Sequence, residues 1–245
     1  MNDSVDALDP RIAQTLPYLQ YLYDWEAHLP VASLAGVIDD AGGPEHVAFL
    51  VVDLIKGFTS IGPLSSPRVG GLVPRVARLL ERAHGLGVRN FVVIQDAHPP
   101  DSPEFEDLPP HCVAGTEEAE MDDGLAALPF ADRFTIIEKR SLDGTVGTPL
   151  LAWCEARAPI RRYVVVGDCT DLCVYELAMS LQMRAHVHAH DYEVVVPGSC
   201  ADTFHLPVDV ARAIGARPHD GDLLHRIFLH QMAANGVMVV GRFDD

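Results

Sequence analysis

Short apolar runs rich in β-branched residues alternate with segments of helical periodicity along most of this chain. The predicted strands cover 46–54, 89–97, 132–139, 161–168, 185–195 and 237–242. The predicted helices cover 74–87, 147–157, 170–184 and 223–237. Strands that alternate with helices form parallel sheets covered on both faces, and their crossovers are right-handed. The pattern therefore predicts an α/β fold: a three-layer, doubly wound domain around a mostly parallel six-stranded sheet.

Two segments stand outside this alternation. Residues 1–44 precede the first predicted strand and contain no strand-like run, so we interpret them as an N-terminal extension to a domain at 45–245. Within the extension, YLYDWEAHLP (21–30) is expected to be a helix or an interface segment. The long connection at 197–222 is rich in Pro, Asp, Gly and His. A connection of this length is typical of a lid or a subunit contact rather than of a core element.

The composition narrows the range of partners and compartments. A formal net charge of −17 argues against nucleic acid, because a phosphate backbone would repel the chain. No apolar run reaches the roughly 18–20 residues that span a bilayer. The first residues lack the basic and apolar regions of a signal peptide, and the five scattered cysteines are expected to be reduced thiols. We therefore expect a cytoplasmic protein that acts on a small molecule, without nucleic-acid or membrane partners.

Reactive side chains follow four of the predicted strands. In an open parallel sheet, ligands bind beyond the carboxyl ends of the strands, near the point where the strand order reverses. The residues at these four ends are Asp53, then Asp96 with His98, then Lys139, and finally the turn that leads to Cys173. Each has an ordinary structural explanation when taken alone: a packed thiol, a helix cap, a solvated lysine. Their shared edge of the sheet is what favours a catalytic site.

Cys173 has the position of a nucleophile. It falls in the first turn of a helix predicted to begin at Thr170 or Asp171, where the helix dipole and unpaired N–H groups favour a thiolate. The amides of Cys169 and Cys173 are candidate donors to a developing oxyanion. Asp53 could take the thiol proton and later give it to a leaving amine. Lys139 could hold the carboxylate and the thiolate in their ionised forms.

The loop after the second predicted strand carries a possible metal site. Asp96 and His98 are followed by Glu104 and His111. Two imidazoles and two carboxylates match the ligand preferences of Zn²⁺, Mn²⁺ or Fe²⁺, and strand side chains two residues apart point the same way. The alternative is a polar loop in an acidic chain that contains 12 histidines.

Five segments together resemble the isochorismatase-like cysteine hydrolases, and within them the nicotinamidases. The resemblance covers about 46–200 and rests on VVDLIKGF, QDAHPPDSPEF, PPHCVAGTEEAE, IEKRSLDGTVGTPL and VVVGDCTDLCVYELA. It implies catalysis by Asp53, Lys139 and Cys173. It also implies one divalent metal ion, with zinc the first candidate and manganese or iron the alternatives. Its ligands would be Asp96, His98, His111 and Glu104.

The same resemblance has further consequences. It implies that Phe58 contacts substrate and that a cis peptide joins Asp168 to Cys169 in the nucleophile turn. Family members are usually homo-oligomers, so we expect one here. The activity it implies is hydrolysis of nicotinamide to nicotinate and ammonia through a cysteine thioester.

The chain departs from the nicotinamidase pattern at three aromatic positions. Ala97 stands between the Asp and His of the metal motif, Leu108 stands where a tryptophan is common, and Arg140 begins a run without aromatics after the lysine. These differences leave other readings open. One is a related amidohydrolase that acts on another small amide, such as an N-carbamoyl compound. Others are a catalytically silent binding or assembly module and a structural-metal or redox protein.

Overall fold

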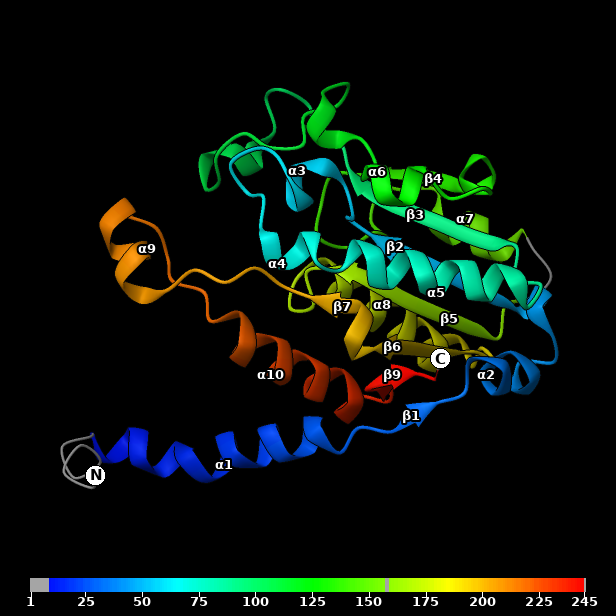
Figure 1. Ribbon diagram of the computed structural model, residues 1–245, viewed down its shortest axis with the longest axis horizontal. Helices are drawn as coiled ribbons and strands as arrows, with labels where there is room; N and C mark the ends of the chain where they lie inside the picture. The colour runs from blue at the N-terminus through cyan, green and yellow to red at the C-terminus, as the bar shows by residue number, and fades with distance from the viewer. Residues whose placement is uncertain (1–8, 157–158, 245) are drawn as a thin grey trace.

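The computed structural model describes residues 9–156 and 159–244, and it has three layers around a parallel sheet (Figure 1). The strands of this sheet are β2 (Val47–Val52), β3 (Asn90–Asp96), β4 (Thr135–Lys139), β5 (Arg162–Asp168), β6 (Glu193–Pro197), β7 (Ala201–Asp202) and β8 (Met238–Val240). Their order is β4-β3-β2-β5-β6-β8, β7 pairs with β5, and each pairing is parallel. The predicted doubly wound fold is confirmed, with a short seventh strand, β7, that comes from the connection at 197–222.

Helices cover both faces of the sheet. The helices of the described residues are α1 (Pro10–Ala27), α2 (Leu34–Asp40), α3 (Lys56–Thr59), α4 (Pro67–Gly70), α5 (Val73–Gly85), α6 (Asp123–Ala126), α7 (Leu150–Glu155), α8 (Cys173–His188), α9 (Val208–Ile214) and α10 (Gly221–Ala234). Side chains from α2, α5 and α6 fill the core on one face, and those from α7, α8 and α10 fill the core on the other.

The buried patterns explain these assignments. All six residues of β2 are buried, as expected for a central strand covered on both sides. In α5 the buried residues recur at helical spacing and form one apolar face toward the sheet. They are Val73, Val76, Leu79, Leu80 and Ala83.

The region around the fifth predicted strand differs from the prediction. Helix α8 begins at Cys173 rather than at Thr170 or Asp171, and it continues to His188, so 185–188 are helical and β6 begins only at Glu193. The alternation in AHVHAH resembles a strand, but Val187 is 76% exposed, whereas Ala185 is buried and continues the buried face of α8. The helix ends where Ala189 adopts a left-handed conformation.

The N-terminal residues form a strand and pack into the core, which the sequence did not indicate. Strand β1 (Val31–Ala32) pairs in parallel with β9 (Arg242–Phe243), so the expectation of no strand before residue 45 is wrong. Residues of α2 pack into the main core, and α1 lies along α10 (Figure 1). Within the described ranges, no helix is both long and apolar enough to cross a bilayer.

Candidate active site

The strand order brings the predicted strand ends together. β2 lies between β3 and β5, and the order of connection reverses at β2, which is where ligands bind in such sheets. Gly167, near the end of β5, has a φ of +119°, and a Cβ there would lie 2.1 Å from the carbonyl oxygen of Val52. Only glycine allows this approach, so the turn after β5 lies directly beside the end of β2.

Lys139 stands at the centre of the site and is buried. Its Nζ lies 2.7 Å from Asp53 Oδ2, 2.6 Å from Asp96 Oδ1 and 3.4 Å from Cys173 Sγ. Burial by itself lowers the pKa of Lys139, but Asp53, Cys173 and Asp96 outweigh it and raise that pKa well above its usual value. The surrounding carboxylates and thiol therefore favour the charged form of the lysine.

Asp53 has the features of a base in contact with the thiol. It is a non-glycine residue with a φ of +53°, a left-handed conformation that is uncommon and often found at functional sites. Its Oδ1 accepts a hydrogen bond of 2.9 Å from the backbone N–H of Asp96. Burial, followed by the charge of Asp96, raises the pKa of Asp53 to about 6, although Lys139 opposes the shift.

Cys173 is the first residue of α8 and is buried. Burial raises the pKa of its thiol well above the usual value; Lys139 opposes this, while Asp53 and Asp96 add to it. Burial and the two carboxylates therefore favour the neutral thiol, whereas the helix N-terminus was expected to favour the thiolate. A carboxylate oxygen of Asp53 and the sulfur of Cys173 lie within 4.8 Å of each other, so a base for this proton is at hand.

The turn between β5 and α8 has the expected cis peptide between Asp168 and Cys169. Asp168 is buried, and burial raises the pKa of its carboxyl well above the usual value, with a smaller opposing effect from Cys169. In the described part of the chain, the amide N–H groups of Cys169 and Cys173 have no backbone acceptor outside helix and strand pairing. These two amides remain the candidate donors to a bound oxyanion.

The predicted metal ligands also come together. Ligand atoms of Asp96, His98 and His111 all lie within 4.8 Å of one another, and all three residues are buried. Both ring nitrogens of His98 are buried without a hydrogen-bond partner among the described residues. Its Nε2 lies 3.5 Å from Asp96 Oδ2 and 3.6 Å from Glu104 Oε2. A buried imidazole that faces two carboxylates fits a divalent cation such as zinc.

The loop that carries these ligands is fixed at its base. The N–H of His98 donates to the carbonyl of Cys112, and the N–H of Ala114 donates to the carbonyl of His98, at 3.0 and 2.9 Å. Nδ1 of His111 lies 2.9 Å from the carbonyl oxygen of Pro109. A carbonyl can only accept, so we assign the proton to Nδ1, which leaves Nε2 of His111 as the free lone pair.

The metal group and the catalytic group are not separate. Strands β3 and β5 are separated by β2, as expected. From this separation we expected a metal bound after β3 to lie across the pocket from the thiol after β5. Asp96 belongs to both groups: its carboxylate contacts Lys139 and lies within 4.8 Å of Cys173 Sγ, and it also faces His98. Glu104 lies outside this group of three, and its Oε2 faces His98.

Two phenylalanine rings flank the histidines. The Phe58 ring, on α3, lies 5.8 Å from the His111 ring, centroid to centroid. The Phe105 ring lies 5.7 Å from His98 and 5.5 Å from His111. Phe105 was not among the predicted site residues. Its place directly after Glu104 in the metal loop was the one signal for it in the sequence.

A family model described as "Isochorismatase domain" matches residues 47–240. The chain belongs to the isochorismatase family. Nicotinamidase 1 of Arabidopsis thaliana is 33% identical over 218 residues, which cover 80% of this chain and 86% of that protein. The nicotinamidase/pyrazinamidase of Mycobacterium tuberculosis is 27% identical over 145 residues, which cover 54% of this chain and 76% of that protein.

Solved structures of isochorismatase-type enzymes have the same fold. The pyrazinamidase of Pyrococcus horikoshii in complex with zinc has a TM-score of 0.62 and 21% identity, with 80% of this chain and 98% of that chain covered. N-carbamoylsarcosine amidase from Thermoplasma acidophilum has a TM-score of 0.59 and 22% identity, with 79% and 95% covered. The family and its nicotinamidase relatives identify this isochorismatase-family protein as an amide-hydrolysing enzyme.

Proposed function

We propose that this enzyme hydrolyses nicotinamide to nicotinate and ammonia, with Cys173 as nucleophile and a divalent metal ion in the site. The observation that carries the proposal is the contact of Lys139 Nζ with Asp53, Asp96 and Cys173 together. The Arabidopsis relative named as a nicotinamidase supports the substrate. The zinc in the Pyrococcus pyrazinamidase, together with the geometry around His98, supports the metal.

In the proposed reaction Asp53 takes the thiol proton as Cys173 Sγ attacks the amide carbon. The carbonyl oxygen becomes an oxyanion and accepts hydrogen bonds from the backbone N–H groups of Cys169 and Cys173. Asp53 then gives its proton to the leaving nitrogen, and ammonia departs. Water deprotonated by Asp53 hydrolyses the thioester and releases the carboxylate and the thiol. Lys139 remains protonated throughout, and its charge stabilises Asp53 in the ionised form.

Asp96, His98 and His111, with Glu104 beside them, are the residues that would hold the metal. Bound there, the ion would supply a Lewis-acidic contact for the pyridine nitrogen and so help to orient the amide toward the thiol. Phe58 and Phe105 lie against the two imidazoles and would pack on the substrate ring. An N-carbamoyl compound is the second candidate, because Ala97 and Leu108 replace two aromatics usual in nicotinamidases.

The test is an ammonia-release assay on nicotinamide, pyrazinamide and N-carbamoylsarcosine, combined with metal analysis of the protein. We expect turnover of nicotinamide by the wild type and none by Cys173→Ala. The matched control is Cys200→Ala, because Cys200 is also buried but packs into the core on the opposite face of the sheet from Cys173. Turnover of the N-carbamoyl compound alone would favour the second candidate. Full activity in Cys173→Ala would exclude the cysteine mechanism.

A further inference from the structure

A histidine from α10 contacts the turn that carries the nucleophile. Nδ1 of His225 lies 2.8 Å from Oγ1 of Thr170, and both residues are buried. Thr170 follows Cys169 and precedes Cys173 by three residues. Its side chain therefore lies on the backbone segment that joins the two candidate oxyanion amides.

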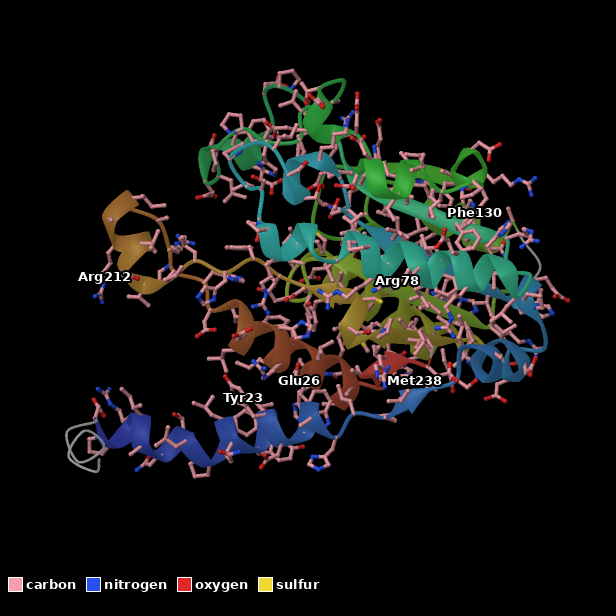
Figure 2. All side chains as sticks on the ribbon, viewed as in Figure 1. Tyr23, Glu26, Arg78, Phe130, Arg212 and Met238 are labelled. Atoms are coloured by element: carbon pink, nitrogen blue, oxygen red, sulfur yellow. The ribbon has the colours of Figure 1, made fainter. Side chains whose placement is uncertain are left out.

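The other side of this histidine faces the N-terminal helix. Nε2 of His225 lies 3.8 Å from Oε1 of Glu26, on α1. Glu26 is fixed in turn, because its Oε2 lies 2.6 Å from Nε of Arg226, whose guanidinium lies 4.0 Å from the centre of the Tyr23 ring. Figure 2 shows Tyr23 and Glu26 between α1 and α10. A continuous set of contacts thus leads from α1 through His225 to Thr170.

The protonation of His225 follows from its neighbours. Burial lowers the pKa of its imidazole, and Arg68 and Arg226 add to this effect, whereas Asp202 and Glu26 oppose it. The neutral ring has one N–H, and the carboxylate of Glu26 favours it on Nε2. Nδ1 is then an acceptor, so we assign the hydroxyl of Thr170 as the donor of the 2.8 Å hydrogen bond.

Thr170 is also held through its backbone. Its N–H donates to the carbonyl of Asp202, on β7, at 2.9 Å. The two bonds fix the residue from two sides, because His225 comes from α10 and Asp202 from the strand beside β5. Loss of the side-chain bond leaves the backbone bond, so the turn should remain folded while the amides of Cys169 and Cys173 gain freedom.

We infer that His225 is a positioning residue for the nucleophile turn, and that α1 supports it through Glu26. This inference rests on the proposed cysteine chemistry. It gives a function to the N-terminal helix, which lies before the 47–240 range that the family model matches. An ångström-scale misplacement of reacting groups can lower a rate by about 10²-fold, so a bond of this kind has a measurable effect on turnover.

The experiment compares kcat, KM and the rate of Cys173 alkylation by iodoacetamide in a set of variants of the full chain. Thr170→Val and His225→Ala each remove the bond, whereas Thr170→Ser keeps the hydroxyl and His225→Asn keeps a polar atom near the position of Nδ1. We expect the first two to lower kcat at least about 10-fold with little change in KM, since the nucleophile rather than the binding site is displaced. The conservative pair should retain most of the activity.

The double variant Thr170→Val/His225→Ala should lose no more than the worse single variant, because both changes remove the same bond. The matched control is His230→Ala, since His230 also contacts α1 from α10, with its Nε2 3.2 Å from the Tyr21 hydroxyl. Among the described residues, its ring contacts are with Tyr18, Tyr21 and Trp25 of α1 rather than with the turn. Additive losses, or an equal loss of kcat in His230→Ala, would overturn the inference. So would unchanged kcat in Thr170→Val.

Two outcomes separate this inference from the proposed function. If the wild type releases no ammonia from any amide tested, the proposed function fails, and the alkylation rates still test the positioning of Cys173. Slower or faster alkylation shared by Thr170→Val and His225→Ala, but absent in Thr170→Ser, supports the inference. If His225→Ala does not fold, the comparison of Thr170→Val with Thr170→Ser decides the matter alone.

Discussion

Lys139 Nζ lies 2.7 Å from Asp53 Oδ2, although the strands that carry them, β4 and β2, are separated by β3. The contact is possible because the lysine side chain reaches across the end of β3, where it also meets Asp96 at 2.6 Å. One buried cation therefore pairs with two carboxylates, and the carboxylate of Asp96 also faces His98 and His111. The charge balance of the site depends on this single lysine.

The proposed role of Asp53 as the base leads to a prediction about a substitution that changes only its charge. Asp53→Asn should lower kcat for amide hydrolysis by at least about 10²-fold, because an amide cannot accept the thiol proton. The fold should survive, since an amide oxygen can still accept the hydrogen bond from the Asp96 N–H. The measurement is steady-state ammonia release with a thermal unfolding scan. Asp122→Asn is the control, because the Asp122 carboxylate caps α6 and accepts a hydrogen bond from the Thr59 hydroxyl instead of facing the thiol. Near wild-type turnover in Asp53→Asn would remove it from the catalytic set.

Replacing Lys139 should lower both the stability and the activity of the enzyme. Lys139→Met leaves Asp53 and Asp96 buried without their cation, and breaking a buried ion pair typically costs about 3–5 kcal/mol. Urea unfolding should therefore show a much lower free energy of unfolding, and turnover should fall by at least about 10²-fold. The double variant Lys139→Met/Asp53→Asn should be more stable than Lys139→Met alone, because one unpaired carboxylate is gone.

The reverse order of stability, with the double variant below the single one, would contradict this view of the charge balance. Lys56→Met provides the matched control. Lys56 also contacts several carboxylates, those of Glu117, Glu120 and Asp123, but these three acids are largely exposed. Surface pairs contribute little to stability, so this variant should unfold close to the wild type.

The position of Phe105 beside the two histidines leads us to expect that the substrate ring packs against it. Its ring is 5.7 and 5.5 Å from those of His98 and His111, whereas Leu108 is 40% exposed. Phe105→Ala should raise KM for nicotinamide more than it lowers kcat, because it removes packing common to the bound substrate and the transition state. Leu108→Ala should change KM less. Equal effects of the two changes on KM would show that Phe105 has no special contact with the ring.

Much of the site could be predicted from the sequence, because the ends of buried parallel strands are easy to locate. Parallel strands are continuous apolar runs, so the polar residue that ends each run is easy to locate, and the carboxyl ends of neighbouring strands meet at one edge. This reasoning placed Asp53, Asp96, Lys139 and the turn before Cys173 on the same edge. The structure brings these residues within contact distance.

Other features had no local signal. The bond between Thr170 and His225 joins residues 55 positions apart. Thr170 lies in the nucleophile-turn segment, but His225 lies outside every segment of the resemblance, so nothing in the sequence paired the two. The two-residue pairing of β1 with β9 likewise depends on a partner at the other end of the chain. At the end of α8, the local pattern was misleading. Period-2 alternation over 185–190 favours a strand, but the buried face of a helix that began at Cys173 continues through Ala185.

The shared position of Asp96 gives the final prediction, which concerns removal of the metal. We expect about one divalent transition-metal ion per chain, and we expect His98→Ala and His111→Ala to lower that content, since each removes one of a small number of protein ligands. Treatment with a chelator should reduce nicotinamide hydrolysis, with a rise in KM, because the ring nitrogen loses its contact. Metal analysis and kinetics on the same samples provide the measurement. His46→Ala is the control, because His46 directly precedes β2, at the opposite end of that strand from Asp53.

Removal of the metal should affect the reactivity of the Cys173 thiol much less than it affects amide hydrolysis. Lys139 contacts Asp53, Asp96 and Cys173 directly, so these contacts do not depend on a bound ion. The rate at which iodoacetamide alkylates Cys173 should therefore change much less on chelation than the rate of hydrolysis does. Circular dichroism on the chelated protein distinguishes a local effect from unfolding. If alkylation and hydrolysis are lost together while the protein stays folded, the ion acts on the thiol through Asp96, and its role is activation of Cys173 rather than orientation of the substrate.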